Sequence, residues 1–511
     1  MTDQAPKRRG RAARTAARSA GSSAPPEQPI RKVPAYQPVS DDALDRISAQ
    51  ADWILEHVGL ELRDDPVATK LFKGAGAQVD GEAVRFPRGL LQDICATVPS
   101  EFQLHARDPA YTVKLGSDAL VLMPGYGSPF VADRINGRRY ATLADFHAFL
   151  KLGWSSPYLQ HGGGVVVEPT NIPVSKRHLD MVYGHLTLGA KPFMGAVTAP
   201  ERADDSLAMA EIAFGAEVMG KGAVIQANIN GNSPLTYDVT MTDALRRYAA
   251  AGQCVCVSPA VFGGAMGPLT PAAIAAQTHA EVLVGIALTQ LVKPGCPVIY
   301  GSFHNTMSLK SGALTFGTPE ANLASFALAG LARRMGVPFR SGGGSVTGSN
   351  TADGQAMAES TAALWSTILS GTHQVWHAAG WLEGGLTMGF EKYVMDLDNC
   401  GAVLKMIGGL SATAEDFAQE SYFEAGIGQT FLSTAHTMAH FETANFAGDI
   451  AEAGPFETWQ EAGAPSQQVR ATTRWQEMLE AYEQPAIESA VQGALLAFVH
   501  RRREELPDEW Y

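Results

Sequence analysis

Polar and aromatic side chains gather where the short apolar runs of this sequence end. The polar ones are mainly amides, hydroxyls and imidazoles, among them Asn228, His304, Asn305 and His377. The same segments contribute aromatic rings, and carboxylates and lysines are scarce among them. Because ring faces attract ammonium groups, and quaternary ones most strongly, this set predicts a polar, nearly uncharged site for a cationic ligand.

Two other chemistries would need residues that this set lacks. A phosphate site would use Arg and Lys, and metal-assisted hydrolysis would use several His and Asp at strand ends. His436 and His440 have the one-turn spacing of zinc ligands, and Glu442 is nearby. A zinc site needs three or four ligands, so no metal site is predicted. A metal-dependent barrel hydrolase that uses these three residues remains an alternative.

The elements that must position these side chains alternate between strand and helix from about residue 155 to 385. Short apolar runs occur at 158–167, 192–197, 223–228, 253–258, 297–303, 337–341 and 374–378. Amphipathic stretches between them predict helices at 175–188, 201–219, 238–251, 271–291, 319–335 and 353–370. This alternation predicts a parallel sheet, with an eighth unit expected near 385–435.

Eight units in about 250 residues favour a TIM (β/α)8 barrel over an open sheet. The glycine triplets at 162–164 and 342–344 do not have the G-x-G-x-x-G spacing that an open dinucleotide-binding sheet would use. We therefore expect an α/β fold with the barrel over 151–435 and the site at the carboxyl ends of its strands. Residues 39–150 are predicted to form an N-terminal α+β subdomain, and 436–511 a C-terminal helical extension.

Charge is distributed unevenly along the 511 residues. Residues 1–38 contain eight Lys and Arg against two acidic residues, a net +6, so a total of −13 leaves −19 for the rest. The tail lacks the apolar residues that would offset its ordering entropy and is predicted to be disordered. The acidic body argues against nucleic-acid and anionic-membrane partners, which need clustered Lys and Arg. Five scattered cysteines, and no apolar run near the ~20 residues of a membrane span, indicate a cytoplasmic protein.

Four segments carry a resemblance to a known family. They are Gly-Tyr-Gly at 125–127, the stretch from Tyr300 to Asn305, and the stretches 343–359 and 376–388. Together they are similar to the trimethylamine methyltransferase superfamily, which includes glycine betaine methyltransferases. The resemblance extends over about residues 40–505. It implies a TIM barrel that moves a methyl group from a methylated amine to the Co(I) of a corrinoid held by a separate protein, with no cofactor bound in this chain.

Superfamily members that use trimethylamine carry pyrrolysine in the loop after the sixth strand, which corresponds here to 345–350. Only ordinary residues occur in that stretch, so the resemblance favours the branch similar to glycine betaine methyltransferases. A quaternary ammonium is already cationic and leaves as a neutral amine, so its transfer needs orientation and a dry pocket rather than a general acid. A methyltransferase for trimethylamine or another methylamine, and a non-catalytic binder of betaine-like solutes, remain alternatives.

The predicted pocket combines a cage of rings with groups that orient the substrate. The cage walls are Tyr126, Phe303, Trp376 and Phe390. His304 and His377 are predicted to hydrogen-bond a substrate carboxylate, and Asn228, Asn305 and Gln355 to set its orientation. Tyr126 and His377 are the expected positioning residues for the transfer. The expected partners are a quaternary amine, a corrinoid protein and further copies of this chain.

Overall fold

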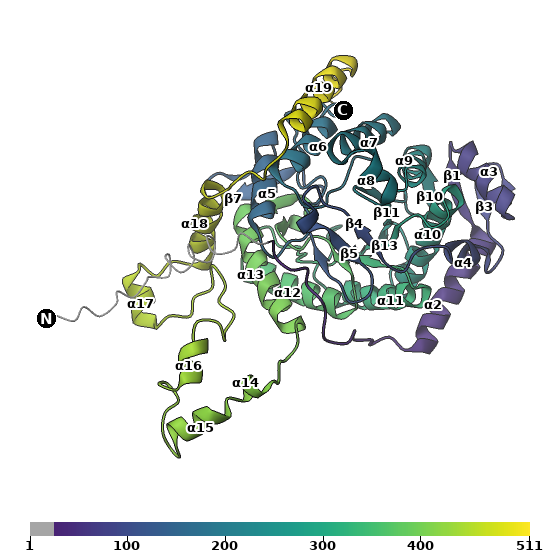
Figure 1. Cartoon of the computed structure of the whole chain (residues 1–511). Coiled ribbons are helices and arrows are strands. Elements are labelled where there is room, and N and C mark those ends of the chain that lie inside the picture. The colour runs from purple at the N-terminus through teal and green to yellow at the C-terminus, as the bar shows by residue number, and fades with distance from the viewer. Residues whose placement is uncertain (1–24, 511) are drawn as a thin grey trace.

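The computed structural model describes residues 25–510 and has a parallel sheet at its centre (Figure 1). In spatial order its strands are β6 (Val121–Leu122), β15 (Gln374–Val375), β14 (Phe339–Ser341), β13 (Val298–Thr306), β11 (Cys254–Val257) and β9 (Gln226–Ile229). A further strand, β12 (Ala260–Gly263), pairs with the end of β13. All of these neighbours run parallel. The predicted mixed α/β fold with a parallel sheet is confirmed.

Two extended segments continue the hydrogen bonding from β9 round to β6. They coincide with the runs at 158–167 and 192–197, where strands are predicted, but they form isolated bonds rather than regular ladders. In order round the sheet, the donor and acceptor pairs are Gly195 N to Gln226 O (3.0 Å), Met194 N to Gly163 O (2.9 Å), Gly162 N to Pro192 O (2.8 Å) and Gln160 N to Leu122 O (3.0 Å).

Helices surround this sheet (Figure 1). They are α5 (Leu143–Ser155), α6 (Arg177–Leu188), α7 (Pro200–Phe214), α8 (Ala216–Lys221), α9 (Val239–Ala250), α10 (Pro271–Val292), α11 (Pro319–Met335), α12 (Gly354–Leu369) and α13 (Phe390–Ile407). Their starts follow from local chemistry, since proline opens α7, α10 and α11 and the Asp353 carboxylate caps α12. The stretch predicted as one helix at 201–219 is broken at Gly215, whose φ of 81° ends α7.

Helix α10 is the most buried of these elements. By length and composition it could cross a membrane, which no segment of this sequence was expected to do. However, 89% of its most apolar window is buried inside the protein, where it packs against α9, α11 and β13. It is therefore the central helix of the core.

The eighth strand–helix unit is not where the sequence predicts it, so that expectation is wrong. Within 385–435 the only strand is β17 (Thr387–Gly389), which pairs with β16 (Trp381–Leu382) and β7 (Phe130–Asp133) outside the main sheet. The position beside β15 is taken instead by β6, from the region predicted to be the N-terminal subdomain. The hairpin of β7 and β8 (Gly137–Tyr140) separates β6 from its helix α5, which hides the alternation in the sequence.

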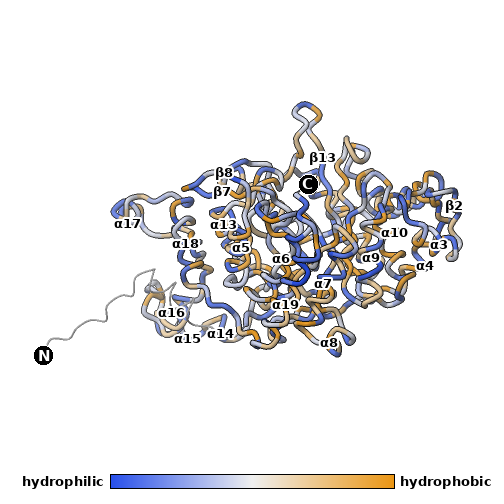
Figure 2. The backbone as a smooth tube through the Cα atoms, turned by 90° about the horizontal axis from the view of Figure 1, so that it is seen from above, coloured by the Kyte–Doolittle hydropathy of each residue, from blue (hydrophilic) through white to orange (hydrophobic). Residues whose placement is uncertain are grey.

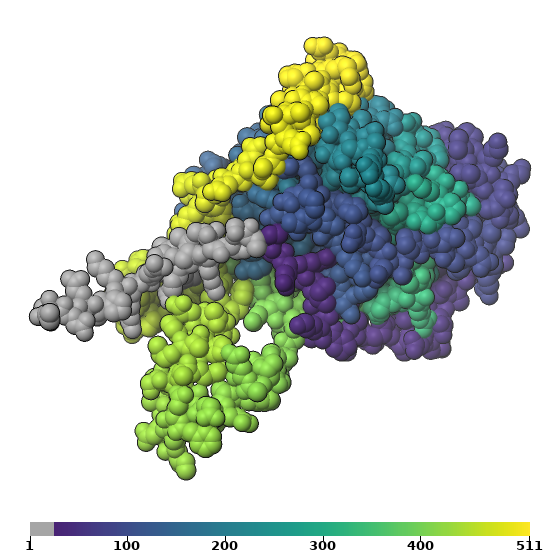
Figure 3. All heavy atoms as spheres, viewed as in Figure 1, coloured from purple at the N-terminus to yellow at the C-terminus, as the bar shows by residue number. Residues whose placement is uncertain are grey.

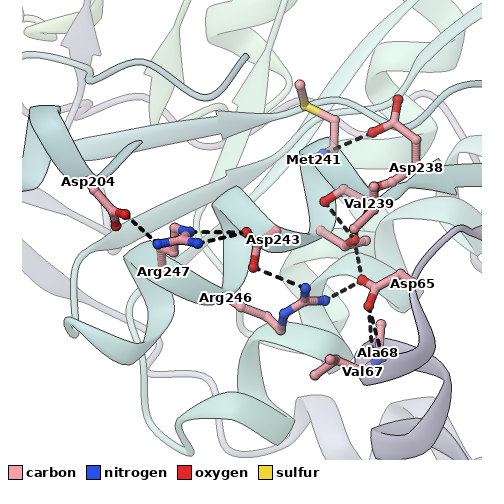
Figure 4. A network of polar contacts seen from close by, with 11 residues as sticks. Asp65, Val67, Ala68, Asp204, Asp238, Val239, Met241, Asp243, Arg246 and Arg247 are labelled. Atoms are coloured by element: carbon pink, nitrogen blue, oxygen red, sulfur yellow. Dashed lines mark hydrogen bonds and ion pairs between the residues drawn. The ribbon is translucent and has the colours of Figure 1, made fainter. Parts of the chain in front are cut away.

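The N-terminal region contributes three helices and three strands of a small four-stranded sheet, and the fourth strand, β10 (Thr236–Asp238), comes from the middle of the chain. The three strands are β1 (Leu60–Arg63), β2 (Gln78–Asp80) and β3 (Ala83–Arg85), and the helices are α2 (Asp41–Trp53), α3 (Pro66–Ala75) and α4 (Leu90–Cys95); a separate hairpin joins β4 (Phe102–Leu104) to β5 (Val113–Leu115). Figure 4 shows the polar network that fastens this region to the helices round the main sheet. Asp65 caps α3 by accepting from Val67 N and Ala68 N, both at 3.0 Å, and pairs with Arg246 of α9.

The two ends of the described chain lie against the body. Helix α18 (Gln467–Glu480) packs on α13, and α19 (Ser489–Glu505) packs on α6 and α7, where Arg502 pairs with Asp205 at 2.7 Å. Residues 25–38 fall in the tail predicted to be disordered, yet Arg31 is buried and Lys32 N donates to Ile407 O at 2.8 Å. The remainder of that prediction, for residues 1–24, lies outside the described residues.

A fully buried ion pair holds the segments beside the carboxyl end of the sheet together. Lys392 Nζ lies 2.5 Å from Asp396 Oδ1, and both side chains are 0% exposed. The ammonium also donates to Ser360 Oγ at 2.9 Å, and the carboxylate accepts from Gly380 N at 2.9 Å. The pair thus ties α13 to α12 and to the turn at Gly380.

Replacing Lys392 by Met should leave Asp396 buried without its counter-ion and lower the free energy of unfolding by about 3–5 kcal/mol. The double variant Lys392→Met/Asp396→Asn should lose less, because no uncompensated charge remains. Urea denaturation followed by circular dichroism measures both. The exposed pair Arg46–Asp42 supplies the control, since Arg46→Met should cost under about 1 kcal/mol. Equal midpoints for Lys392→Met and Arg46→Met would contradict this account.

Candidate functional site

Trp376 lies at the end of β15 and forms the centre of the candidate site. The indole is 1% exposed, and its Nε1 donates to Gln374 Oε1 at 2.8 Å. Gln374 in turn donates to Gln226 Oε1 on β9 at 2.8 Å, across the interior of the sheet. The Tyr126 ring lies 5.5 Å from the indole, centroid to centroid. The paired amides therefore fix the plane of Trp376 and hold one of its faces towards the other site residues.

Arg340 projects from β14 over that indole. Its Cζ atom lies 3.8 Å from the centroid of the Trp376 ring, and its Nη1 donates to Ser258 Oγ and to the Ser302 carbonyl oxygen, both at 2.6 Å. The side chain is 2% exposed, and its Nε finds no partner among the described residues. Burial lowers the pKa of Arg340 to about 10, so the guanidinium stays protonated at neutral pH.

This guanidinium contradicts the expectation of a nearly uncharged site. Its neighbours are hydroxyl, carbonyl and ring groups, and no carboxylate of residues 25–510 forms an ion pair with it. A buried charge without a counter-ion is costly, so such a group marks a place for an anion. The sequence does carry a signal for it: Arg340 is the lone charge in the apolar run from Val337 to Ser341.

A second group of rings adjoins the Arg340–Trp376 stack. The ring of Phe303 lies 5.5 Å from His377, 6.0 Å from Trp381 and 5.8 Å from Phe316, and His377 lies 4.2 Å from Trp381. His377 and Trp381 are buried, whereas Phe303 is half-buried. Burial, reinforced by Arg340, holds the pKa of His377 well below its usual range, so this imidazole is neutral.

His377 also has an unusual backbone. Its φ of 58° lies in the left-handed region, which a non-glycine residue adopts at a cost of about 1–3 kcal/mol. Ser345 N donates to the His377 carbonyl at 2.7 Å, and Gly344 N to that of Trp376 at 3.1 Å. A Cβ atom on Gly344 would lie 2.2 Å from the Trp376 carbonyl oxygen, so only glycine allows this approach. The loop at 345–350 thus begins directly beside the site.

Tyr126 and Asn228 complete the wall on the side of β9. Burial raises the pKa of Tyr126 to about 12, so the phenol stays protonated. Several buried polar atoms round the site find no partner among the described residues: Asn228 Oδ1, Asn305 Nδ2, Arg340 Nε, His377 Nδ1 and Trp381 Nε1. Unpaired buried polar groups cost about 1–3 kcal/mol each, so these atoms are available to bind water or the polar groups of a ligand.

The structure brings together six of the predicted site residues, namely Tyr126, Asn228, Phe303, Asn305, Trp376 and His377, and leaves three apart. His304 Nε2 lies 2.9 Å from the Ala321 carbonyl oxygen on α11, because consecutive residues of a strand point to opposite faces. Gln355 lies on α12 and donates to Glu359. Phe390 stacks on Phe149 at 4.3 Å in the core.

His436 and His440 lie on the short helix α16 (Ala435–His440), outside the ring of helices. Their rings are 4.4 Å apart, and His440 Nε2 lies 3.6 Å from Glu415. Residues 25–510 contain no group of three or more His, Cys, Asp or Glu that could hold a metal ion. The geometry therefore gives the hydrolase alternative no third ligand.

Comparison with known proteins identifies the family. The family model described as "Trimethylamine methyltransferase (MTTB)" matches residues 7–507. A glycine betaine methyltransferase of Desulfitobacterium hafniense (strain Y51) is 37% identical over 93% of this chain and 99% of its own length. A trimethylamine methyltransferase of the same species (strain DSM 10664 / DCB-2) is 26% identical over 91% and 94%.

Among solved structures, the monomethylamine methyltransferase of Methanosarcina barkeri superposes with a TM-score of 0.45 at 12% identity, over 89% of this chain and 97% of that one. The family model and the 37% identical relative both span nearly the whole sequence. The chain belongs to the trimethylamine methyltransferase family and is a methyltransferase.

Proposed function

We propose that this methyltransferase takes a methyl group from a zwitterionic quaternary amine of the glycine betaine type and passes it to Co(I) in a corrinoid carried by a separate protein. The main support for a zwitterionic substrate is the buried Arg340 guanidinium. It has no carboxylate partner among the described residues and lies among aromatic rings. A betaine presents the complementary pair of charges, a carboxylate and a trimethylammonium group. The 37% identity to a glycine betaine methyltransferase supports the same class.

In this proposal the substrate carboxylate binds Arg340, whose unpaired Nε is one available donor. Charge-assisted hydrogen bonds of this kind are about twice as strong as neutral ones. The neutral His377 and the Asn305 amide offer further polar atoms without partners. Phe303, Trp381 and Tyr126 supply ring faces for the trimethylammonium group. Because Arg340 covers one face of Trp376, that indole contributes to the carboxylate end rather than to the cage.

The chain's part in catalysis is positioning. The methyl carbon moves to the acceptor while the electron pair of the C–N bond stays on nitrogen, which becomes a neutral tertiary amine. No proton transfer is needed, and the shifted pKa values keep Tyr126 protonated and His377 neutral near pH 7. Rings that surround the ammonium exclude water and hold the methyl group in line with the approaching acceptor. Phe303 and Tyr126 are half-buried, as is Phe262, whose ring lies 5.6 Å from that of Phe303. In this proposal the substrate enters on the side of these three rings.

The fold proposed for this function is a closed (β/α)8 barrel. The chain of backbone bonds through residues 160–163 and 192–195 supports closure between β9 and β6. The first strand–helix unit of the barrel would be β6 with α5, and the last would be β15 with α13. The N-terminal subdomain and the C-terminal helices would lie on either side of the barrel in the sequence. The five free cysteines suit a reducing cytoplasm, which we keep as the proposed location.

A substrate panel tests the function. Glycine betaine, carnitine and proline betaine should be offered with a reduced corrinoid protein, and the loss of Co(I) absorption followed. We expect a spectral change with at least one betaine and none with trimethylamine. A change with trimethylamine alone would overturn the proposed substrate class. Betaine binding without any methyl transfer would instead favour a non-catalytic binder.

Replacing Arg340 by Met should remove the group that binds the substrate carboxylate, while the methionine side chain can still cover the Trp376 ring. Loss of a buried charge partner costs about 2–5 kcal/mol, so the KM for the betaine should rise at least about 30-fold. Tetramethylammonium, which lacks a carboxylate, is the control and should be affected less than about threefold. Equal losses for both compounds in steady-state assays would refute this role of Arg340.

Tyr126→Ala and His377→Ala should each reduce transfer without unfolding the chain. For Tyr126→Ala, loss of a desolvated cation–ring contact of about 2 kcal/mol corresponds to roughly a 30-fold drop in kcat/KM. For His377→Ala, loss of a hydrogen bond to a charged group, worth about 1.5–3 kcal/mol, corresponds to at least about a tenfold drop. His436→Ala, on α16, should retain full activity and serves as the control. Near-normal transfer by both alanine variants would contradict the site assignment.

A further inference from the structure

Residues 409–445 form an arm that stands away from the body (Figure 3). It contains α14 (Ala414–Phe417), α15 (Gln419–Ala425) and α16, and it leaves the body after α13. Local bonds shape it: Thr413 and Asp416 form a capping box, the Thr434 hydroxyl caps α16, and Glu424 accepts from Ala435 N at 2.7 Å. Helices of four to seven residues are too short to be stable alone, so the arm needs further contacts to keep this form.

The arm turns its large apolar side chains outward. Nine of them are exposed by 41–103%: Leu410, Phe417, Tyr422, Phe423, Ile427, Phe431, Leu432, Met438 and Phe441. At about 150–250 Å² for a whole aromatic side chain, the nine expose on the order of 1,000 Å². A typical monomer has no patch above about 600 Å², and a stable interface buries about 800 Å² on each partner. The arm therefore has the area of one side of a permanent interface.

Two possible occupants fit this surface poorly. The first is the segment 1–24, which has Met1 as its single large apolar residue and so cannot cover nine such side chains. The second is the protein that accepts the methyl group, which must reach the carboxyl ends of the strands. Helix α13 runs back from that end, and its last residue, Ile407, bonds Lys32 beside the start of β6. The arm thus leaves from the opposite end, and Figure 2 places α14, α15 and α16 far from β7 and β8.

We propose that the arm packs against the body of a second copy of this chain, each copy giving its arm to the other. A permanent apolar contact is typical of homodimers, whose interfaces resemble a core cut in half. Two arms would not pack on each other, because the arm has five acidic residues and no Lys or Arg, and like charges would meet. Exchange about a twofold axis covers both arms at once and closes the assembly.

The full chain tests this proposal through its mass in solution. Size-exclusion chromatography with light scattering should give an oligomer for the wild type. The double variant Phe423→Asp/Ile427→Asp, which changes side chains 82% and 103% exposed, should raise the dimer Kd by at least about 100-fold. Its circular dichroism and melting temperature at high protein concentration check that the body remains folded. Val58→Asp/Val67→Asp, on exposed apolar residues of the N-terminal region, should leave the mass unchanged.

A second measurement identifies the surface that the arm meets. A photo-crosslinking amino acid at position 423 should join two copies, with the linked peptide lying outside 409–445. A monomeric wild type, an arm variant that stays oligomeric, or crosslinks only from arm to arm would each overturn the proposal.

Discussion

A buried guanidinium that has no carboxylate partner among residues 25–510 constrains the carboxyl end of this sheet. Arg340 is held by a stack on Trp376 and by two oxygen acceptors, none of which neutralises it. The surroundings make this arrangement possible: the Gln226–Gln374 amide pair fixes the indole, and Gly342 keeps the backbone next to Arg340 free of a side chain. Binding of an anion lowers the energetic cost of the isolated charge. The same guanidinium that destabilises the empty site would therefore favour anionic ligands over neutral ones.

The buried Lys392–Asp396 pair makes the contrast clear. Lys392 and Arg340 are both buried cations. Lys392 lies 2.5 Å from a carboxylate, whereas Arg340 has no carboxylate partner among the described residues. The first cation is neutralised within the chain and joins α12, α13 and the Gly380 turn. In the proposed function, the second cation, Arg340, is neutralised by the substrate carboxylate.

The sequence predicts the elements far better than it predicts the site. The apolar pattern places α9, α10, α11 and α12 within about one residue of their observed ends. Helices α9 and α12 bury one face each, whereas α10 is apolar and buried along most of its length. The pattern misses β6 because a two-residue strand followed by a hairpin has no periodicity to detect. Six of the predicted site residues lie close together because strand ends converge. The pattern cannot tell that His304 faces α11 or that Phe390 joins the core, because that depends on strand phase and packing. Arg340 is overlooked because a strand pattern does not say which side is the interior.

The strands round the central sheet are not equally well hydrogen-bonded to their neighbours. Between β9 and β13 continuous ladders bind neighbouring strands, whereas the segments at 160–163 and 192–195 are held by separate hydrogen bonds. Fewer bonds must break together to open that side, so its amide hydrogens should exchange with solvent sooner than those of β11. Tyr126 follows β6 directly beside this weaker seam, so thermal opening there would displace one wall of the site while the Arg340–Trp376 stack stays fixed.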